Sequence, residues 1–249
     1  MLIIIPTAST ESEGFNRCKR CLSQSELPLG SKIVAVVSSG TDFSFSRSVN
    51  HGLSNVEIED ILLLKDDCFM EPHTIKNIMT SGENAGIVGE ALRYNGGKLL
   101  HNGGDFYFNV LSILLKDSMN LAPFYTIRTY LRARKLKTRY VRTFQVSAFP
   151  PKKVDFVTGA LFYIPNSVFK RIGFLDETFV NGFEDADYCL RAKALGFDLR
   201  VKPSARAVHQ EHASLKVHES TVFENLTKLK KKWPRAKIIQ LRKNNVNPE

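Results

Sequence analysis

Two adjacent aspartates, Asp66 and Asp67, follow an apolar stretch with strand character and precede the predicted start of a helix. Carboxylates at the end of a buried strand project into the crevice where open α/β sheets bind ligands. Such oxygen ligands suit Mg²⁺ or Mn²⁺ bridging a diphosphate, because these ions complete their shell with phosphate oxygens and water. The other interpretation is that one aspartate only caps the following helix. The pair alone does not decide between the two.

A second acidic group, formed by Glu184, Asp185 and Asp187, lies at the predicted start of a helix over residues 183–197. The helix dipole favours acids there, so a purely structural role is one interpretation. Crowded carboxylates also repel one another, which can raise one pKa and suit a general base. Arg191 lies four residues beyond Asp187 and could pair with it. Such a pair would leave Glu184 or Asp185 for chemistry.

His209 and His212 follow another short apolar stretch near the end of the second half of the chain. A lone histidine is more often a surface or core residue than a ligand. A metal-binding role for His209 therefore depends on the acidic residues lying nearby in space, which spacing does not reveal.

The elements that must position these residues alternate between strand and helix. Residues 2–7, 32–39 and 60–67 predict strands buried on both faces, and residues 11–25 and 44–54 predict helices between them. This order is typical of a mostly parallel sheet covered by helices. Further strands are expected over 86–94, before a turn at Gly96 and Gly97, and over 154–165. Asn166 is then expected to cap a helix that ends at Gly173.

The chain of 249 residues, with 43% hydrophobic and 24% charged residues, predicts a globular protein of one large or two small domains. It contains no apolar run near the ~18 residues that span a bilayer and no secretory signal, so a cytosolic protein is expected. The Cys18-x-x-Cys21 pair lacks the second half of a zinc site, which favours reduced thiols.

The formal net charge of +10 suggests an anionic partner such as a nucleotide, a nucleic acid or a lipid surface. Basic residues concentrate in an amphipathic, aromatic segment over 121–142 and in the tail over 228–243. Each segment is either a solvated helix face or a site of peripheral attachment to anionic lipid.

Several segments together resemble the family 2 nucleotide-sugar glycosyltransferases of the GT-A fold, especially their rhamnosyltransferase-like branch. The segment SVNHGLS followed by DILLLKDDCFMEP looks like that family's Asn-x-Gly turn and its strand ending in a DxD-type motif, and residues 154–214 resemble its most characteristic block. The resemblance implies an α/β GT-A fold with a mixed, mostly parallel sheet flanked by helices. It implies a GT-A domain over 1–215, which includes the basic segment 121–142, and a basic helical extension over 216–249.

Carried over position by position, the resemblance implies that Asp185 is the catalytic base of an inverting transfer. Asp67, with Asp66 and His209, would bind Mn²⁺ or Mg²⁺ at the diphosphate of the donor. Acceptor or sugar binding would involve Gly159 and Glu184. Nucleotide-sugar binding would involve Thr7, Ser38, Arg47, Asn50 and Lys65.

Three positions depart from the family pattern. Ser38 and Ser39 stand where Asp and Asn are usual, and Lys65 stands where the DxD-type triplet usually begins with Asp or Asn. The lysine could contact phosphate itself, or it could weaken metal binding by repulsion.

The resemblance therefore predicts transfer of a sugar from a UDP or dTDP type donor to a glycan or lipid-linked acceptor. A cytoplasmic location is expected, with attachment to the anionic inner face of the membrane as an option, and no nucleic-acid partner is expected. Two alternatives remain open: a nucleic-acid-binding or metal-dependent nuclease-type protein, and a catalytically inactive glycan-binding member of the same fold. A NAD-binding Rossmann protein is not expected, because no G-x-G-x-x-G follows the first strand.

Overall fold

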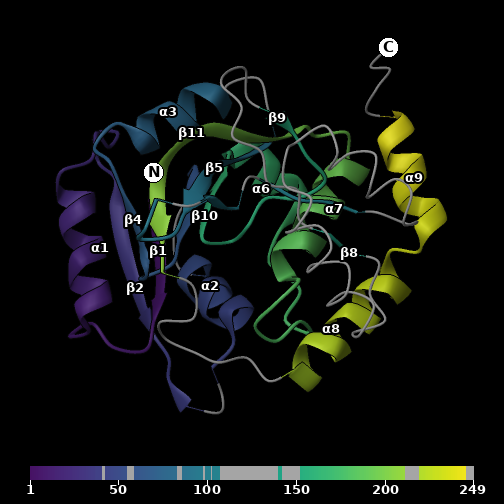
Figure 1. The fold of residues 1–249 in the computed structure, drawn as a ribbon, viewed down its shortest axis with the longest axis horizontal. Helices are drawn as coiled ribbons and strands as arrows, with labels where there is room; N and C mark the ends of the chain where they lie inside the picture. The colour runs from purple at the N-terminus through teal and green to yellow at the C-terminus, as the bar shows by residue number, and fades with distance from the viewer. Residues whose placement is uncertain are drawn as a thin grey trace.

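The computed structural model describes residues 1–40, 43–54, 59–82, 86–97, 99–101, 103–106, 140–141, 152–210 and 219–244. These residues form a mixed sheet with helices on both faces (Figure 1). The basic segment over 121–142 lies outside the described residues, apart from 140–141. No helix in the described part of the chain is long and apolar enough to span a membrane.

The strands are β1 Leu2–Thr7, β2 Lys32–Val37, β3 Ile61–Leu64, β4 Cys68–Met70, β5 Ile87–Arg93, β6 Leu99–His101, β7 Asp105–Phe106, β8 Tyr140–Val141, β9 Lys152–Lys153, β10 Leu161–Ile164 and β11 Leu199–His209. The helices are α1 Glu13–Ser23, α2 Phe45–Leu53, α3 Thr74–Gly82, α6 Asn166–Ile172, α7 Glu184–Ala194, α8 Glu219–Lys232 and α9 Arg235–Asn244.

The main sheet has the strand order β2-β1-β3-β10-β5-β11-β4, with β6 paired to β5 and β9 paired to β11. β1 pairs in parallel with β2 and β3, and β11 pairs in parallel with β5, whereas β10 is antiparallel to both β3 and β5. The predicted mixed α/β architecture is confirmed, although β10, β4, β9 and β6 bring more antiparallel pairing than the sequence suggested. Because β10 is antiparallel to both of its neighbours, β3 and β5 are parallel to each other. The four strands β1, β3, β5 and β11 therefore run in the same direction, and their carboxyl ends lie at one edge of the sheet.

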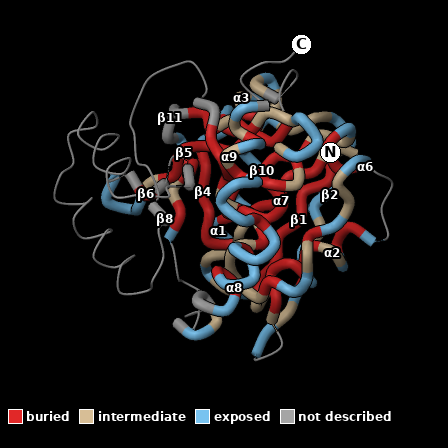
Figure 2. The backbone as a smooth tube through the Cα atoms, turned by 90° about the vertical axis from the view of Figure 1, so that its right-hand side faces the viewer, coloured by how far each residue is buried: buried red, intermediate tan, exposed pale blue. Residues whose placement is uncertain are grey.

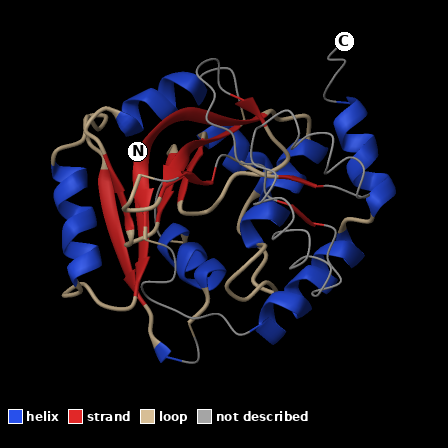
Figure 3. Ribbon diagram, viewed as in Figure 1, coloured by secondary structure: helices blue, strands red, loops and turns tan. Residues whose placement is uncertain are grey.

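Two hydrophobic layers cover the two faces of the sheet, because successive side chains of a strand point to opposite faces. On one face, Ile3 and Ile5 belong to a cluster with Phe15, Cys18 and Leu22 of α1, as the helical spacing of those three residues predicts. On the other face, alternate strand residues pack against α2, α6 and α7. The strands therefore lie between α1 and α7 (Figure 3).

β2 does not have the predicted burial on both faces. It is the last strand at one end of the described sheet, and the side chains of Ile33 and Val37 are 46% and 58% exposed. Val36 is buried and Val34 packs partly against the core. The burial prediction was wrong because an apolar composition does not reveal that a strand has a neighbour on one side only.

The helix α6 begins at Asn166 and is not capped by its side chain, which corrects the predicted cap. Pro165 occupies the cap position, and Asp60 Oδ1 accepts the backbone N–H of Asn166 at 2.8 Å. The helix does end at Gly173, whose φ of 74° lies in the left-handed region that favours glycine.

The basic C-terminal helices α8 and α9 pack onto the core. Leu229, Trp233, Ile238 and Leu241 join the same hydrophobic cluster as α7. The two helices lie on the opposite side of the molecule from α1 (Figure 1), and exposed stretches alternate with buried ones along them (Figure 2). The boundary between residues 215 and 216 remains a prediction, but the tail is part of the folded core.

Candidate active site

Three polar residues meet where β1, β2 and β3 end. The backbone N–H of Ser38 donates to the carbonyl of Thr7 at 2.9 Å, and the Thr7 hydroxyl donates to Asp66 Oδ2 at 2.7 Å. Asp66 is buried, and burial raises its pKa, while the hydrogen bond from Thr7 opposes that rise. The parallel strands thus fix one carboxylate oxygen of Asp66 against β1.

Asp67 meets His209 at the same edge, although the two residues are far apart in the sequence. Gln210 donates its backbone N–H to the Asp67 carbonyl at 3.0 Å, and His209 Nε2 lies 3.1 Å from Asp67 Oδ1. Both side chains are 7% exposed. Burial would raise the pKa of Asp67, but His209 and then Lys65 outweigh it, so the pKa is lowered.

The donor set of Asp67 and His209 fits a divalent cation. Asp67 Oδ1 and His209 Nε2 are both buried, yet neither finds a hydrogen-bond partner of acceptable geometry among the described residues. A carboxylate oxygen and an imidazole nitrogen left in this way are suitable ligands for Mn²⁺. Within the described ranges no group of three or more His, Cys, Asp or Glu side chains is placed to hold a metal ion.

Asp185 lies in the first turn of α7 with both carboxylate oxygens held. Its Oδ2 accepts the backbone N–H of Gly159 at 2.9 Å, and its Oδ1 accepts the backbone N–H of Ala186 at 2.8 Å. The side chain is neither fully buried nor fully exposed. Two fixed N–H donors therefore orient a carboxylate that solvent or a substrate can still reach.

Glu184, next to Asp185, is buried with 5% exposure. Burial first and the charge of Asp185 second raise the pKa of Glu184 to about 7. The backbone N–H of Gly182 donates to Glu184 Oε2 at 2.5 Å and opposes part of that rise. The two neighbouring carboxyl groups thus differ in environment, as the crowding of acids in the sequence suggested.

Lys65 connects the two acidic groups. Its backbone N–H donates to the carbonyl of Ala160 at 3.1 Å, one residue after the glycine that binds Asp185. Its ammonium lies 5.6 Å from the centre of the Phe45 ring, and its charge contributes to the lowered pKa of Asp67 and opposes the rise in the pKa of Glu184. The charge of Lys65 therefore acts on Asp66 and Asp67 and also on Glu184, which is next to Asp185.

An apolar hollow adjoins Asp185. Phe45, Phe162, Leu175 and Tyr188 line it together with Gly159 and Leu63. A Cβ on Gly159 would lie 3.4 Å from the Phe45 ring and 3.6 Å from Asp185 Cβ. A methyl group would thus fit between the Phe45 ring and Asp185 in ordinary van der Waals contact.

Two predicted nucleotide-sugar-binding residues lie on α2, outside this cluster of acids. Asn50 uses its amide to bind the backbone of Leu175 and the carboxylate of Glu177. Arg47 is exposed on the same helix. Their role in nucleotide binding remains a prediction, but Asn50 clearly ties α2 to the loop that precedes α7.

Sequence reasoning missed Phe45 and Tyr188, because an aromatic residue in an amphipathic helix looks like any core residue. The proximity of Thr7, Asp66, Asp67 and His209 agrees with the predicted grouping, whereas the roles assigned to these residues remain predictions. The predicted pair of Asp187 and Arg191 is present at 3.0 Å.

Comparison with protein families matches residues 16–234 to the glycosyltransferase-like family 2. Comparison with curated proteins found no match. Among solved structures, GalNAc-T7 with UDP, GalNAc and Mn²⁺ is similar, with a TM-score of 0.59 and 14% identity over 93% of this chain and 48% of that one. S. aureus TarS is similar with a TM-score of 0.52 and 12% identity, over 92% of this chain and 43% of that one.

A shorter TarS structure, residues 1–349, gives a TM-score of 0.57 and 11% identity over 99% of this chain and 70% of that one. This chain thus spans about half or less of the GalNAc-T7 and longer TarS structures. At these identities the likeness shows the fold, which is the GT-A fold that the sequence predicted. The rhamnosyltransferase-like branch remains a prediction.

Proposed function

This chain belongs to the glycosyltransferase-like family 2, and on that premise we propose that it moves a sugar from a nucleoside diphosphate donor to a hydroxyl of a glycan or lipid-linked acceptor. The observation that carries the proposal is the orientation of Asp185, whose side chain is only partly buried, by the N–H groups of Gly159 and Ala186. A carboxylate that is fixed but still accessible is suited to remove a proton.

In the proposed reaction, Asp185 takes the proton of the acceptor hydroxyl as its oxygen attacks the anomeric carbon. The bond between that carbon and the phosphate oxygen breaks, and the nucleoside diphosphate leaves on the opposite side, so the configuration inverts. The leaving group develops negative charge and needs cationic neutralisation where it departs. Lys65 has an ammonium near both acidic groups and would supply part of it.

A divalent ion would supply the remaining neutralisation. Asp67 and His209 would hold Mn²⁺ or Mg²⁺, and Asp66, fixed by Thr7, would support them. Asp67 Oδ1 and His209 Nε2 lie 3.1 Å apart and are buried without a hydrogen bond of acceptable geometry among the described residues, which supports this assignment. GalNAc-T7, which shares the fold, was solved with UDP, GalNAc and Mn²⁺, and this supports a UDP or dTDP type donor here.

A donor panel tests the proposal. Thermal shifts with UDP, dTDP and GDP sugars, each with and without Mn²⁺, should reveal stabilisation by one nucleotide class, because a ligand of the native state raises its stability. Transfer should then be measured as release of the matching nucleoside diphosphate. EDTA should stop it, and Asp67→Asn should require more Mn²⁺ to restore it. Absence of both stabilisation and turnover across the panel would contradict the proposal.

We also propose that the outer face of α8 and α9 contacts anionic lipid. The sequence from Leu226 to Lys243 contains no acidic residue, and Lys231, Arg235, Lys237 and Lys243 are exposed. The side chains of Leu226, Leu229, Trp233, Ile238 and Leu241 are buried. Attachment would therefore be electrostatic and would not insert Trp233 into the bilayer.

Flotation with vesicles containing phosphatidylglycerol tests this surface. Binding should weaken with salt and with the double change Lys231→Glu and Lys243→Glu. The matched control is Lys19→Glu with Arg20→Glu, which alters the net charge equally on α1, on the far side of the molecule. Equal loss of binding in both double variants would show that net charge alone is responsible.

A further inference from the structure

The loop from Leu175 to Phe183 leads directly into Glu184 and Asp185, and α2 holds one side of it. Asn50 accepts the backbone N–H of Leu175 at 2.9 Å and donates to the carbonyl of the same residue at 3.0 Å. The buried hydroxyl of Ser46 donates to the carbonyl of Phe179 at 3.0 Å. These contacts fix the start and the middle of the loop.

The end of the loop adopts a backbone conformation that requires support. Asn181 and Phe183 have φ values of 54° and 69°, which residues other than glycine rarely adopt. Asn181 accepts the backbone N–H of Phe45 and donates to the carbonyl of Phe43, each at 3.0 Å. The turn is thus kept in place by other elements and not by its own preference.

α8 holds the opposite side of the loop. Asn225, which is 1% exposed, donates to the carbonyl of Val180 at 2.7 Å and accepts the backbone N–H of the same residue at 3.4 Å. Lys228 donates to the carbonyl of Thr178 at 2.7 Å. A buried asparagine that satisfies both backbone groups of one loop residue is a strong positional constraint.

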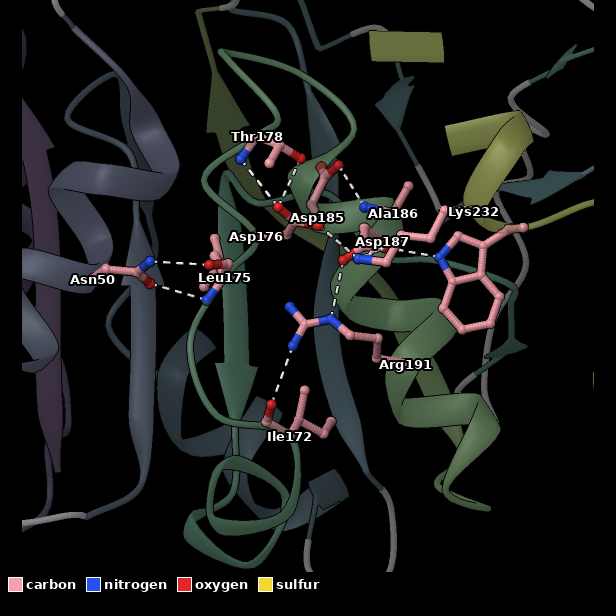
Figure 4. Close-up of polar contacts among 11 residues, drawn as sticks. Asn50, Ile172, Leu175, Asp176, Thr178, Asp185, Ala186, Asp187, Arg191 and Lys232 are labelled. Carbon is pink, nitrogen blue, oxygen red and sulfur yellow. Dashed lines mark hydrogen bonds and ion pairs between the residues drawn. The ribbon is translucent and has the colours of Figure 1, made fainter. Parts of the chain in front are cut away.

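Asp187 attaches the first turn of α7 to Lys232, at the end of α8, and to Trp233, which follows it. Its carboxylate is fully buried, and its Oδ1 accepts the indole N–H of Trp233 at 2.8 Å and lies 2.8 Å from the ammonium of Lys232. Lys232 also reaches Asp176 at 2.6 Å. One ammonium therefore links the beginning of the loop to the helix that carries Asp185 (Figure 4).

We propose that α8 and the tryptophan that follows it hold this loop so that Glu184 and Asp185 stay in their reactive positions. Asn225, Lys232 and Trp233 are then positioning residues, since they act through the loop and through Asp187. This inference rests on the proposed function for its catalytic consequence. The holding of the loop can be tested without it.

Trp233→Phe tests the inference, because it keeps a buried aromatic ring and removes the N–H donor together with the volume of the second ring. Lys232→Met, at a side chain that is 36% exposed, is a second variant that removes the ammonium and keeps the aliphatic stem. Ile238→Val is the matched control, because it trims the packing of α9 and leaves all loop contacts in place. Amide hydrogen exchange over residues 176–186 and steady-state kinetics are measured on the full chain.

Loss of a hydrogen bond to a buried charge should speed exchange in this segment by roughly tenfold or more in both test variants. The control should stay within about twofold of the unmodified protein. The kcat of the test variants should fall by about tenfold or more, with the donor KM nearly unchanged, because misplacement of a reacting group affects the chemical step.

Unchanged exchange in Trp233→Phe and Lys232→Met would overturn the inference. Faster exchange with a normal kcat would show that the loop is held but does not position the reaction, and this would overturn it as well. If the unmodified protein transfers no sugar in any assay, the proposed function fails, and the exchange measurement alone decides whether α8 holds the loop.

Discussion

Replacing Glu184 by glutamine should change how the stability of the protein depends on pH. Glu184 is buried beside Asp185, and these surroundings raise its pKa from 4.5 to about 7. Glutamine has the same shape, cannot ionise, and can still accept the N–H of Gly182 through its amide oxygen. The substitution therefore removes the charge while it leaves the packing of the site in place.

The sign of the effect follows from proton binding. Between the pKa of the unfolded chain, 4.5, and that of the folded protein, about 7, the folded state keeps a proton that the unfolded state has lost. Stability contributed by this group is therefore complete below pH 4.5, falls as the pH rises to about 7, and is constant above it. A shift of this size corresponds to about 3 kcal/mol at pH 8 and to less than about 1 kcal/mol at pH 5.

Urea unfolding of the unmodified protein and of Glu184→Gln at pH 5 and pH 8 measures how the contribution of Glu184 to stability changes with pH. The benefit of the substitution should grow by about 2 to 3 kcal/mol between the two pH values, since the titration of groups that do not interact with Glu184 cancels in the difference. Glu224→Gln, at an exposed glutamate on α8, should show no such growth. An equal effect of Glu184→Gln at both pH values would refute the reasoning.

Two further substitutions follow from the geometry of the site. Gly159→Ala should fold normally, because the added Cβ would lie 3.4 Å from Phe45 and 3.6 Å from Asp185. Thermal unfolding should therefore be unchanged, whereas kcat should fall because the methyl group narrows the space beside Asp185. A normal kcat would show that the acceptor does not use this space. Thr7→Val should lower the free energy of unfolding, measured in urea, by about 1 to 3 kcal/mol, because the buried Asp66 carboxylate loses a hydrogen-bond donor. Thr7→Ser keeps the hydroxyl and should avoid most of this loss. Equal free energies of unfolding for the two variants would contradict the role of the hydroxyl.

The parts of the fold that depend on local patterns could be predicted from the sequence. The spacing of Phe15, Cys18 and Leu22 predicts the buried side of α1, and the structure confirms it. The i,i+4 pair of Asp187 and Arg191 follows from helical geometry alone. The exposure of β2 could not be predicted, because strand order is a property of the whole chain and does not appear in the composition of one strand.

Some residues of the candidate site could also be predicted from the sequence, and others could not. Asp66 and Asp67 stand out because charged residues at the end of an apolar strand are unusual, and the resemblance of the later block to known sequences pointed to Asp185 and His209. The contacts of Asn225 and Trp233 with the loop before α7 were missed. In the sequence these two residues belong to the basic extension over 216–249, and nothing local distinguishes a side chain that packs inward from one that faces solvent.

The central claim, that Asp185 is the base of a glycosyl transfer, is tested most directly by single-turnover kinetics of Asp185→Asn. The amide keeps the shape and one acceptor for the N–H groups of Gly159 and Ala186, so the fold and donor binding should persist. A positioned general base contributes roughly 10² to 10⁴ to the rate, and a loss of that size is predicted, with unchanged stabilisation by the donor nucleotide. A rate within a few fold of the unmodified enzyme would contradict the claim.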